Sequence, residues 1–299
     1  MADIGLPTPL FPVRADEFLK AEFLHPGRSH KARVARALVD DAEHRGEISA
    51  GRRRIMLERT GGNLGIALAV EARVRGYELT LVTDPHYSRI KRRIAVRLGA
   101  TVIDRGERYP DCADNQAVID ILLADGRADY LYLNQFGNPA NPRAHETGTG
   151  AEMLAQLRGG GLGRDVTVVL VGGLGTGASM RGVSRALRTW FGSVLTVGVE
   201  PPQCDLLAGQ YAEHPFQGIA VGQPAPFFPA SDLDAIVAVG AEQAVAAQHE
   251  LIRRFRILVG PSSGANYAAL AAARSHAVVR ARRDCIFVTL LYDRGEDYE

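Results

Sequence analysis

Lysine is rare in this sequence, and a rare lysine is a candidate for chemistry that arginine cannot perform. Of the 35 basic residues, only Lys20, Lys31 and Lys91 are lysines. A neutral amine can attack a carbonyl carbon, whereas a guanidinium stays protonated in proteins. An arginine-rich composition is also the ordinary mark of a biased genome. The three lysines are therefore candidates for covalent chemistry, and for Lys31 the alternative is a solvated residue at the start of a helix.

A glycine-rich turn at residues 172–179 has the composition of a phosphate site. It follows the apolar run DVTVVLV and precedes a segment with helical spacing. Glycines let backbone N–H groups close around an anion, and the hydroxyls of Thr176 and Ser179 can add donors. A tight turn without a ligand is one alternative. A dinucleotide site using Gly173, Gly175 and the acidic Glu200 is another, but its spacing departs from G-x-G-x-x-G.

A second glycine-rich turn, Thr60-Gly61-Gly62-Asn63-Leu64-Gly65, follows the run IMLER and opens another helical segment. The free N–H groups at a helix start attract a carboxylate. The side chain of Asn63 can donate or accept a hydrogen bond at the same place. The alternative role of Asn63 is an ordinary helix cap.

Composition and charge exclude several classes of function. Apolar residues make up 46% and charged residues 23% of the chain, and the formal net charge is +1. Such a balance argues against nucleic-acid and membrane partners. Three widely spaced cysteines indicate neither a disulfide framework nor a metal site. The first residues lack the pattern of a secretory signal, and no further domain is expected after DRGEDYE, so we expect a cytoplasmic protein.

The elements that must position these turns alternate between strand-like and helix-like patterns. Helical spacing, ended by a glycine, predicts helices over 29–45, 63–75 and 87–98. Short β-branched or aliphatic runs predict strands over 54–58, 78–83, 101–104, 130–134, 166–172, 194–199, 235–239 and 285–291. Alternation of this kind predicts an α/β fold with mainly parallel, doubly wound sheets. Ligands of such folds bind beyond the carboxyl ends of the strands, where both glycine turns are expected.

Six segments, in order, resemble the cysteine synthase and cystathionine β-synthase branch of the fold type II pyridoxal-phosphate enzymes. They are EFLKAEFLHPGRSHKAR, TGGNLG, NQFGNPANPRAHETGTG, GLGTGAS, FQGIAVG and VGPSSGAN. The resemblance covers nearly the whole chain, from Thr8 to Glu296. It implies the tryptophan synthase β-like fold, with pyridoxal 5'-phosphate in the cleft between two domains. The expected domains are residues 26–138, with the cofactor lysine and the asparagine turn, and residues 6–25 plus 139–299, with the phosphate turn.

The resemblance gives individual positions a role. It implies that Lys31 holds the cofactor as a Schiff base and then acts as the base at Cα. It implies that Asn63 binds the ring hydroxyl and that the hydroxyl of Ser262 meets the ring nitrogen, although Ser262 can also serve as an N-cap of a helix over 263–274. The implied phosphate site comprises Gly175, Thr176, Gly177, Ala178 and Ser179. The implied substrate site comprises Thr60, Gly61, Gly62, Asn63, Leu64 and Gln135.

The asparagine turn departs from the family at two positions. The usual turn carries a serine where Gly61 stands and a threonine where Leu64 stands, so two hydroxyl donors to the substrate carboxylate are missing. Each loss costs about 1.5–3 kcal/mol if nothing replaces the donor. Arg59 stands where proline is common, and Arg28 precedes the lysine. Either arginine can meet an anionic group on an unusual substrate or lie at the surface, and no role is assigned to His30.

The resemblance implies β-replacement on a serine- or cysteine-type amino acid through an aminoacrylate. The product would be cysteine or another β-substituted alanine, and the partners would be a small amino acid and a small nucleophile. A homodimer is also implied. The nearest alternative is β-elimination, as in a cysteine desulfhydrase or a serine/threonine dehydratase. More distant alternatives are an NAD-dependent oxidoreductase and a non-catalytic scaffold.

Overall fold

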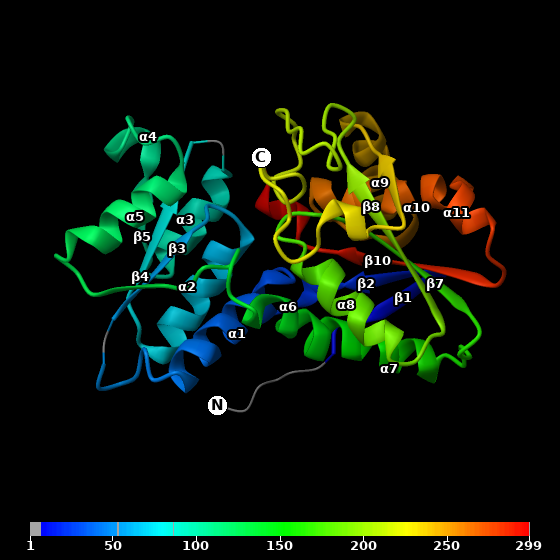
Figure 1. Cartoon of the computed structure of the whole chain (residues 1–299), viewed down its shortest axis with the longest axis horizontal. Helices are drawn as coiled ribbons and strands as arrows, with labels where there is room; N and C mark the ends of the chain where they lie inside the picture. Colours follow the sequence, from blue (N-terminus) through cyan, green and yellow to red (C-terminus); the bar gives the residue numbers. More distant parts are fainter. Residues whose placement is uncertain (1–6, 53, 86, 299) are drawn as a thin grey trace. The chain divides into compact units, whose positions relative to one another are not determined.

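The computed structural model describes residues 7–298 except residues 53 and 86. Contacts divide the chain into two compact units (Figure 1). The larger unit holds the described residues up to His25 together with Pro142–Gly295, and the smaller unit holds Pro26–Asn141 and the C-terminal residues from Glu296. The expected outer domain limits, residues 6 and 299, lie outside the described residues. Among the described residues, no helix has the length and apolar character that a membrane span requires.

The smaller unit is a four-stranded sheet whose strands all run parallel, in the order β5-β4-β3-β6. Its strands are β3 (Ile55–Arg59), β4 (Leu79–Thr83), β5 (Thr101–Asp104) and β6 (Tyr130–Tyr132). Its helices are α1 (Lys31–His44), α2 (Asn63–Arg75), α3 (Arg89–Arg97), α4 (Arg105–Arg108) and α5 (Asn115–Asp125). Each strand therefore ends at the same edge of the sheet.

Helices cover both faces of this sheet, because consecutive strand residues point to opposite sides. Met56 and Leu81 pack with the buried residues of α1 and α2. The adjacent residues Leu57 and Val82 pack instead with the buried residues of α5. This is the doubly wound arrangement that the alternation of patterns predicted.

The larger unit is a six-stranded sheet in the order β1-β2-β10-β7-β8-β9. Its strands are β1 (Leu10–Arg14), β2 (Glu17–Ala21), β7 (Thr167–Gly173), β8 (Ser193–Glu200), β9 (Ala235–Ala238) and β10 (Cys285–Leu291). Its α-helices are α7 (Ala151–Gly159), α8 (Ala178–Arg188), α9 (Ala241–Phe255), α10 (Pro261–Ser275) and α11 (Ala277–Arg280). The short helix α6 (Ala140–Ala144) crosses the boundary between the units. A π-helical turn, η2 (His145–Gly150), and three 3₁₀ turns complete the elements: η1 (Glu22–Leu24), η3 (Ala230–Asp232) and η4 (Gly295–Asp297).

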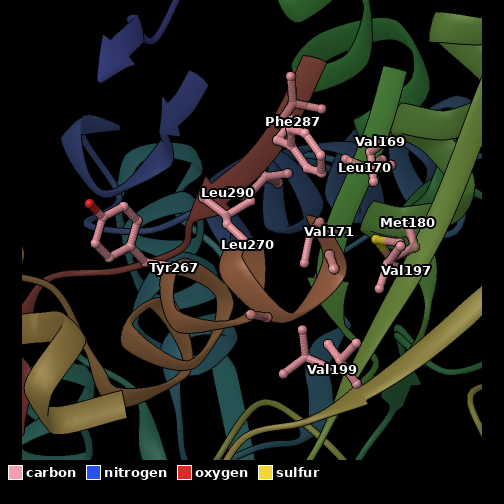
Figure 2. Close-up of a cluster of buried hydrophobic side chains, with 14 of the residues drawn as sticks. Val169, Leu170, Val171, Met180, Val197, Val199, Tyr267, Leu270, Phe287 and Leu290 are labelled. Carbon is pink, nitrogen blue, oxygen red and sulfur yellow. The ribbon is translucent and has the colours of Figure 1, made fainter. Parts of the chain in front are cut away.

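Strand β1 pairs with β2 antiparallel, and every other pair in this sheet is parallel. Central strand β7 is buried along its whole length, as a parallel strand covered on both faces should be. Figure 2 shows its Val171 beside Leu270 of α10, with Met180 of α8 and Val197 of β8 nearby. This packing fixes both elements that flank the glycine turn, β7 before it and α8 after it.

Candidate active site

Lys31 is the first residue of α1, and the turn before it is tightly packed. The Lys31 N–H group donates to the Ser29 hydroxyl at 3.2 Å. A Cβ atom at Gly27 would lie 2.4 Å from the Cβ atom of Ala32, so only glycine fits there. Burial lowers the pKa of Lys31 from 10.5 to about 8, although the charge of Glu58 opposes the shift. The structure thus gives this amine a larger neutral, nucleophilic fraction at physiological pH than a solvated lysine has.

The other two lysines carry structural contacts. The ammonium group of Lys20 lies 2.6 Å from the Thr8 carbonyl oxygen and 2.8 Å from the Glu152 carboxylate. The ammonium group of Lys91 stacks over the Tyr298 ring, 3.7 Å from its centroid. Of the three lysines, Lys31 is the one whose surroundings suit covalent chemistry.

Arg28 is paired within the smaller unit. Its Nε atom lies 3.0 Å from Oδ2 of Asp297, whose side chain is almost fully buried. Arg28 also has a positive φ of 69°. Asp297 therefore pairs with the charge of Arg28, and the sequence alone did not indicate this ion pair.

The turn Thr60–Leu64 connects β3 to α2 at the carboxyl edge of the small sheet. The Thr60 hydroxyl accepts a hydrogen bond from the Gly62 N–H group at 3.3 Å. Gly62 is the N-cap of α2, and no side chain caps this helix. Asn63 is therefore inside the first turn, so its alternative role as a helix cap was wrong. The uncapped start of α2 leaves backbone N–H groups of the kind that can attract an anion.

Two of the predicted substrate residues, Leu64 and Gln135, can offer different hydrogen-bond donors. The side chain of Leu64 is 2% exposed and belongs to the core under α1 and α2, which leaves its backbone N–H group as the donor at this position. Gln135 follows β6 and approaches the same turn: its Nε2 group donates to the Arg59 carbonyl at 3.3 Å. The structure thus brings Gln135 and the Thr60–Leu64 turn together.

Arg59 is held by an aromatic ring beside this turn. Its guanidinium carbon lies 4.3 Å from the centroid of the Phe136 ring. A cation over an aromatic face is attracted by the ring quadrupole. The sequence left two alternatives for Arg59, a substrate contact or a surface residue. In the structure, Arg59 is half-buried next to the turn.

Glu58 is a member of this site that the sequence analysis missed. Its side chain is fully buried, and its two carboxylate oxygens accept hydrogen bonds from the N–H groups of Arg59 and Gln135, both at 3.1 Å. Burial raises its pKa to about 8, against the opposing effects of these hydrogen bonds and of the charges on Arg59 and Lys31. A carboxylate within the otherwise apolar run Ile-Met-Leu-Glu was the available signal, because buried parallel strands rarely contain one.

The glycine turn of the larger unit connects β7 to α8. A Cβ atom at Gly173 would lie 2.3 Å from the Ile219 side chain. One at Gly175 would lie 2.7 Å from the Gly218 carbonyl oxygen, and one at Gly177 would lie 2.7 Å from the Phe228 nitrogen. Gly177 also has a φ of +77° and is the N-cap of α8, and the N–H group of Ala178, the first residue of the helix, donates to the Thr176 hydroxyl at 3.3 Å. The turn is thus a backbone cradle at a helix N-terminus, which fits an anion such as phosphate.

Ser262 lies next to the segment that lines this cradle. A Cβ atom at Gly218 would be 3.7 Å from the Ser262 hydroxyl, and Gly218 itself contacts Gly175. The N-cap of α10 is Gly260 and Pro261 is its first residue, so the alternative role of Ser262 as an N-cap was wrong. Ser262 itself is buried, with 4% of its surface exposed.

Among the residues described, no group of three or more histidine, cysteine, aspartate or glutamate side chains is arranged to hold a metal ion.

Comparisons with known proteins show the family of this chain. The family model "pyridoxal-phosphate dependent enzyme" matches residues 2–289. Cysteine synthase A of Escherichia coli strain K12 is 35% identical over 84% of this chain and 77% of its own. Cysteine synthase of Haemophilus influenzae is 34% identical over 94% of this chain and 87% of its own.

Solved structures give the same result. An O-ureido-L-serine synthase superposes with a TM-score of 0.83 at 28% identity, covering 97% of this chain and 90% of that one. A hydrogen sulfide-producing enzyme of Fusobacterium nucleatum superposes with a TM-score of 0.82 at 30% identity, covering 98% of this chain and 95% of that one. The expected fold class is confirmed by these neighbours.

Proposed function

Because the chain belongs to the family of pyridoxal-phosphate-dependent enzymes, we propose that it catalyses β-replacement on a serine- or cysteine-type amino acid. The product would be cysteine or another β-substituted alanine. The relatives named cysteine synthase support this class of reaction, as does the neighbour that makes O-ureido-L-serine. The reaction needs a small amino acid and a small nucleophile. The implied homodimer and cytoplasmic location stay predictions.

The groups present fit the cofactor. A glycine cradle at a helix N-terminus suits its phosphate, and an amine with a lowered pKa suits its aldehyde. We assign the phosphate to Gly175–Ser179, the aldehyde to Lys31, the ring hydroxyl to Asn63 and the ring nitrogen to Ser262. When bound, pyridoxal phosphate supplies an electron sink for bonds at Cα.

The residues of the chain then divide the work. With the cofactor bound, Lys31 would take the proton from Cα of the substrate and later return one. Ser262 would hold the ring nitrogen through a neutral hydroxyl, which favours the protonated ring less than a carboxylate would and so suits loss of a β-substituent. The N–H groups of the Thr60–Leu64 turn and the amide of Gln135 hold the substrate carboxylate.

The single observation that carries the proposal is the position of Lys31 as the first residue of α1, directly after the packed turn at Gly27, where burial lowers the pKa of its amine. The resemblance implies that this residue is the cofactor lysine. The test is a titration of the purified holoprotein with L-cysteine and O-acetyl-L-serine, followed by its near-visible absorbance. We expect one of them to change the spectrum and a nucleophile such as sulfide to restore it. A protein that binds the cofactor without any response to either would contradict the proposal.

β-Elimination is the second candidate, because a structural neighbour is named for hydrogen sulfide production. Pyruvate formation from L-cysteine or O-acetyl-L-serine without an added nucleophile distinguishes the two reactions. The nicotinamide alternative loses its basis, since the family binds pyridoxal phosphate. In addition, Glu200, the acidic residue expected for a ribose, accepts the Leu206 N–H group at 3.0 Å.

The phosphate cradle yields its own prediction. Replacing Gly177 with alanine puts a Cβ atom 2.7 Å from the Phe228 nitrogen at a φ of +77°, so the turn must open. We expect the dissociation constant of pyridoxal phosphate to rise at least about tenfold, which corresponds to a loss of about 1.4 kcal/mol. Fluorescence titration of the apoprotein measures it.

The matched control for this prediction is Gly163→Ala in the same unit. No atom lies within 4 Å of the Cβ position at Gly163. Its dissociation constant should equal that of the unmodified protein. Equal affinities for the Gly177 and Gly163 variants would contradict the role of the cradle.

A further inference from the structure

The turn that we assign to the substrate carboxylate has no room for a side chain at position 61. A Cβ atom on Gly61 would lie 2.0 Å from the Thr83 hydroxyl oxygen and 2.6 Å from the Cβ atom of Tyr87. Real Cβ atoms do not approach other heavy atoms so closely. At the adjacent Gly62, by contrast, no atom lies within 4 Å of the Cβ position. The exclusion is therefore specific to position 61, and the side chains of Thr83 and Tyr87 fill that space.

Tyr87 lies next to the turn because it follows β4, the strand that pairs with β3. Strand β4 ends at Thr83, and β3 and β4 are parallel, so the segment after β4 lies beside the turn after β3. The N–H group of Tyr87 donates to the Asp84 carbonyl at 3.3 Å. The first ring atom of Tyr87 lies 2.7 Å from the Cβ position of Gly61.

The phenol of Tyr87 lies in a polar part of this region. Burial raises its pKa, the charge of Asp84 acts in the same direction, and the charge of Arg59 opposes both. The charges of Asp84 and Arg59 therefore both act on this phenol. Tyr87 is half-buried, whereas Thr83 is fully buried, so of the two only Tyr87 presents surface to a ligand.

We propose that Tyr87 is a specificity-determining residue whose phenol hydroxyl donates a hydrogen bond to the carboxylate of the amino-acid substrate. It supplies the donor that a side chain at position 61 cannot supply, because its own ring takes that space. Gly61 and Tyr87 are thus coupled by packing: the Tyr87 ring can lie against the turn because position 61 carries no side chain. This inference rests on the proposed function, since it names a further contact of the same substrate.

The first test removes only the hydroxyl. In the holoprotein of the Tyr87→Phe variant, we expect the dissociation constant of L-cysteine or O-acetyl-L-serine to rise about tenfold or more, since a hydrogen bond to a charged group is lost. Absorbance titration measures this constant. The thermal midpoint and the borohydride labelling of Lys31 should not change, because the ring remains. An unchanged dissociation constant would overturn the proposal.

The second test measures the coupling between the two positions through stability alone. Gly61→Ser should lower the thermal midpoint in the native background, and the loss should be smaller when Tyr87 is glycine, which lacks both Tyr87 atoms that the added Cβ atom would meet. Gly51→Ser, at an open position of the same unit, is the control and should cost little in both backgrounds. Equal losses from Gly61→Ser in both backgrounds would overturn the proposal.

The two failures are distinguishable. If the unmodified holoprotein gives no absorbance response to either amino acid, the proposed function fails and this inference fails with it. If it responds and Tyr87→Phe responds with the same affinity, only the inference about Tyr87 fails.

Discussion

Replacement of Lys31 with alanine is expected to abolish covalent attachment of pyridoxal phosphate and to slow the reaction by about 10³-fold or more. In the proposed function, the side chain at this position both binds the aldehyde and moves the Cα proton, so its loss should remove both tasks at once. Lys31→Arg should be no better, because a guanidinium does not give up its proton. Borohydride treatment of the holoprotein makes a lysine–cofactor linkage permanent, and peptide mapping by mass spectrometry then locates it.

The other two lysines are internal controls for this experiment. Lys20 is held by the Thr8 carbonyl and the Glu152 carboxylate, and Lys91 stacks on the Tyr298 ring. We expect the reduced cofactor on the peptide that contains Lys31 and on neither of the others. Cofactor found on Lys20 or Lys91, or an alanine variant that keeps its near-visible absorbance, would refute the assignment.

The elements with a regular pattern were predictable from the sequence. The helix over 63–75 and the strands over 101–104 and 285–291 have the bounds that periodicity predicted. Gly76 ends α2 in the left-handed conformation, which is the role that a glycine stop implies. Such elements are set by local signals, namely the spacing of apolar residues and the conformational freedom of glycine.

Elements without a local signal were missed. Strand β1 contains Pro12, and proline argues against a strand unless the strand lies at a sheet edge, as β1 does. Helix α5 was missed because the apolar residues of NQAVIDILLAD do not form a narrow stripe. The π-helical turn η2 in HETGTG gave no periodic signal at all. In each case the surrounding fold decides the local structure.

The residues of the candidate site also fall into two groups, those that a local sequence motif indicated and those that it did not. Motif order alone indicated Lys31, Asn63 and the turn at 175–179, because each lies in a segment with its own signature. Glu58 and Tyr87 were not indicated. Their importance comes from contacts between strands that are distant in sequence: Glu58 accepts from Gln135, and Tyr87 fills the space beside Gly61. Only the tertiary structure brings these pairs together.

Glu58→Gln is expected to change the pH dependence of stability of the cofactor-free protein. The folded-state pKa of Glu58 is raised from 4.5 to about 8, so between these values the folded state binds a proton that the unfolded state releases. The stabilisation from this group is therefore present in acid and is lost as the pH rises through 8, with a slope of at most about 1.4 kcal/mol per pH unit. Glutamine does not titrate and should remove this slope.

Lys31 gives the opposite slope on the alkaline side. Its folded-state pKa is lowered from 10.5 to about 8, so between these values the unfolded state binds the extra proton and stability rises with pH. The combined contribution of the two groups to the free energy of unfolding is therefore lowest near pH 8. Glu58→Gln should remove the acid side of this minimum, and Lys31→Ala should remove the alkaline side. Thermal midpoints of the apoproteins from pH 5 to 10, compared with the unmodified protein, measure both effects.

Glu58→Gln should also change the pKa of the Lys31 amine. The charge of Glu58 raises the pKa of the amine, so its removal should lower that pKa further, by about one unit for each 1.4 kcal/mol of attraction lost. The pH at which Lys31 of the apoprotein becomes reactive toward an amine reagent reports this shift. Glu107→Gln, an exposed acid of the same unit, is the control and should leave the midpoint in place. If both variants titrated like the unmodified protein, Glu58 would be a buried structural carboxylate that holds Gln135 and has no part in setting the protonation of Lys31.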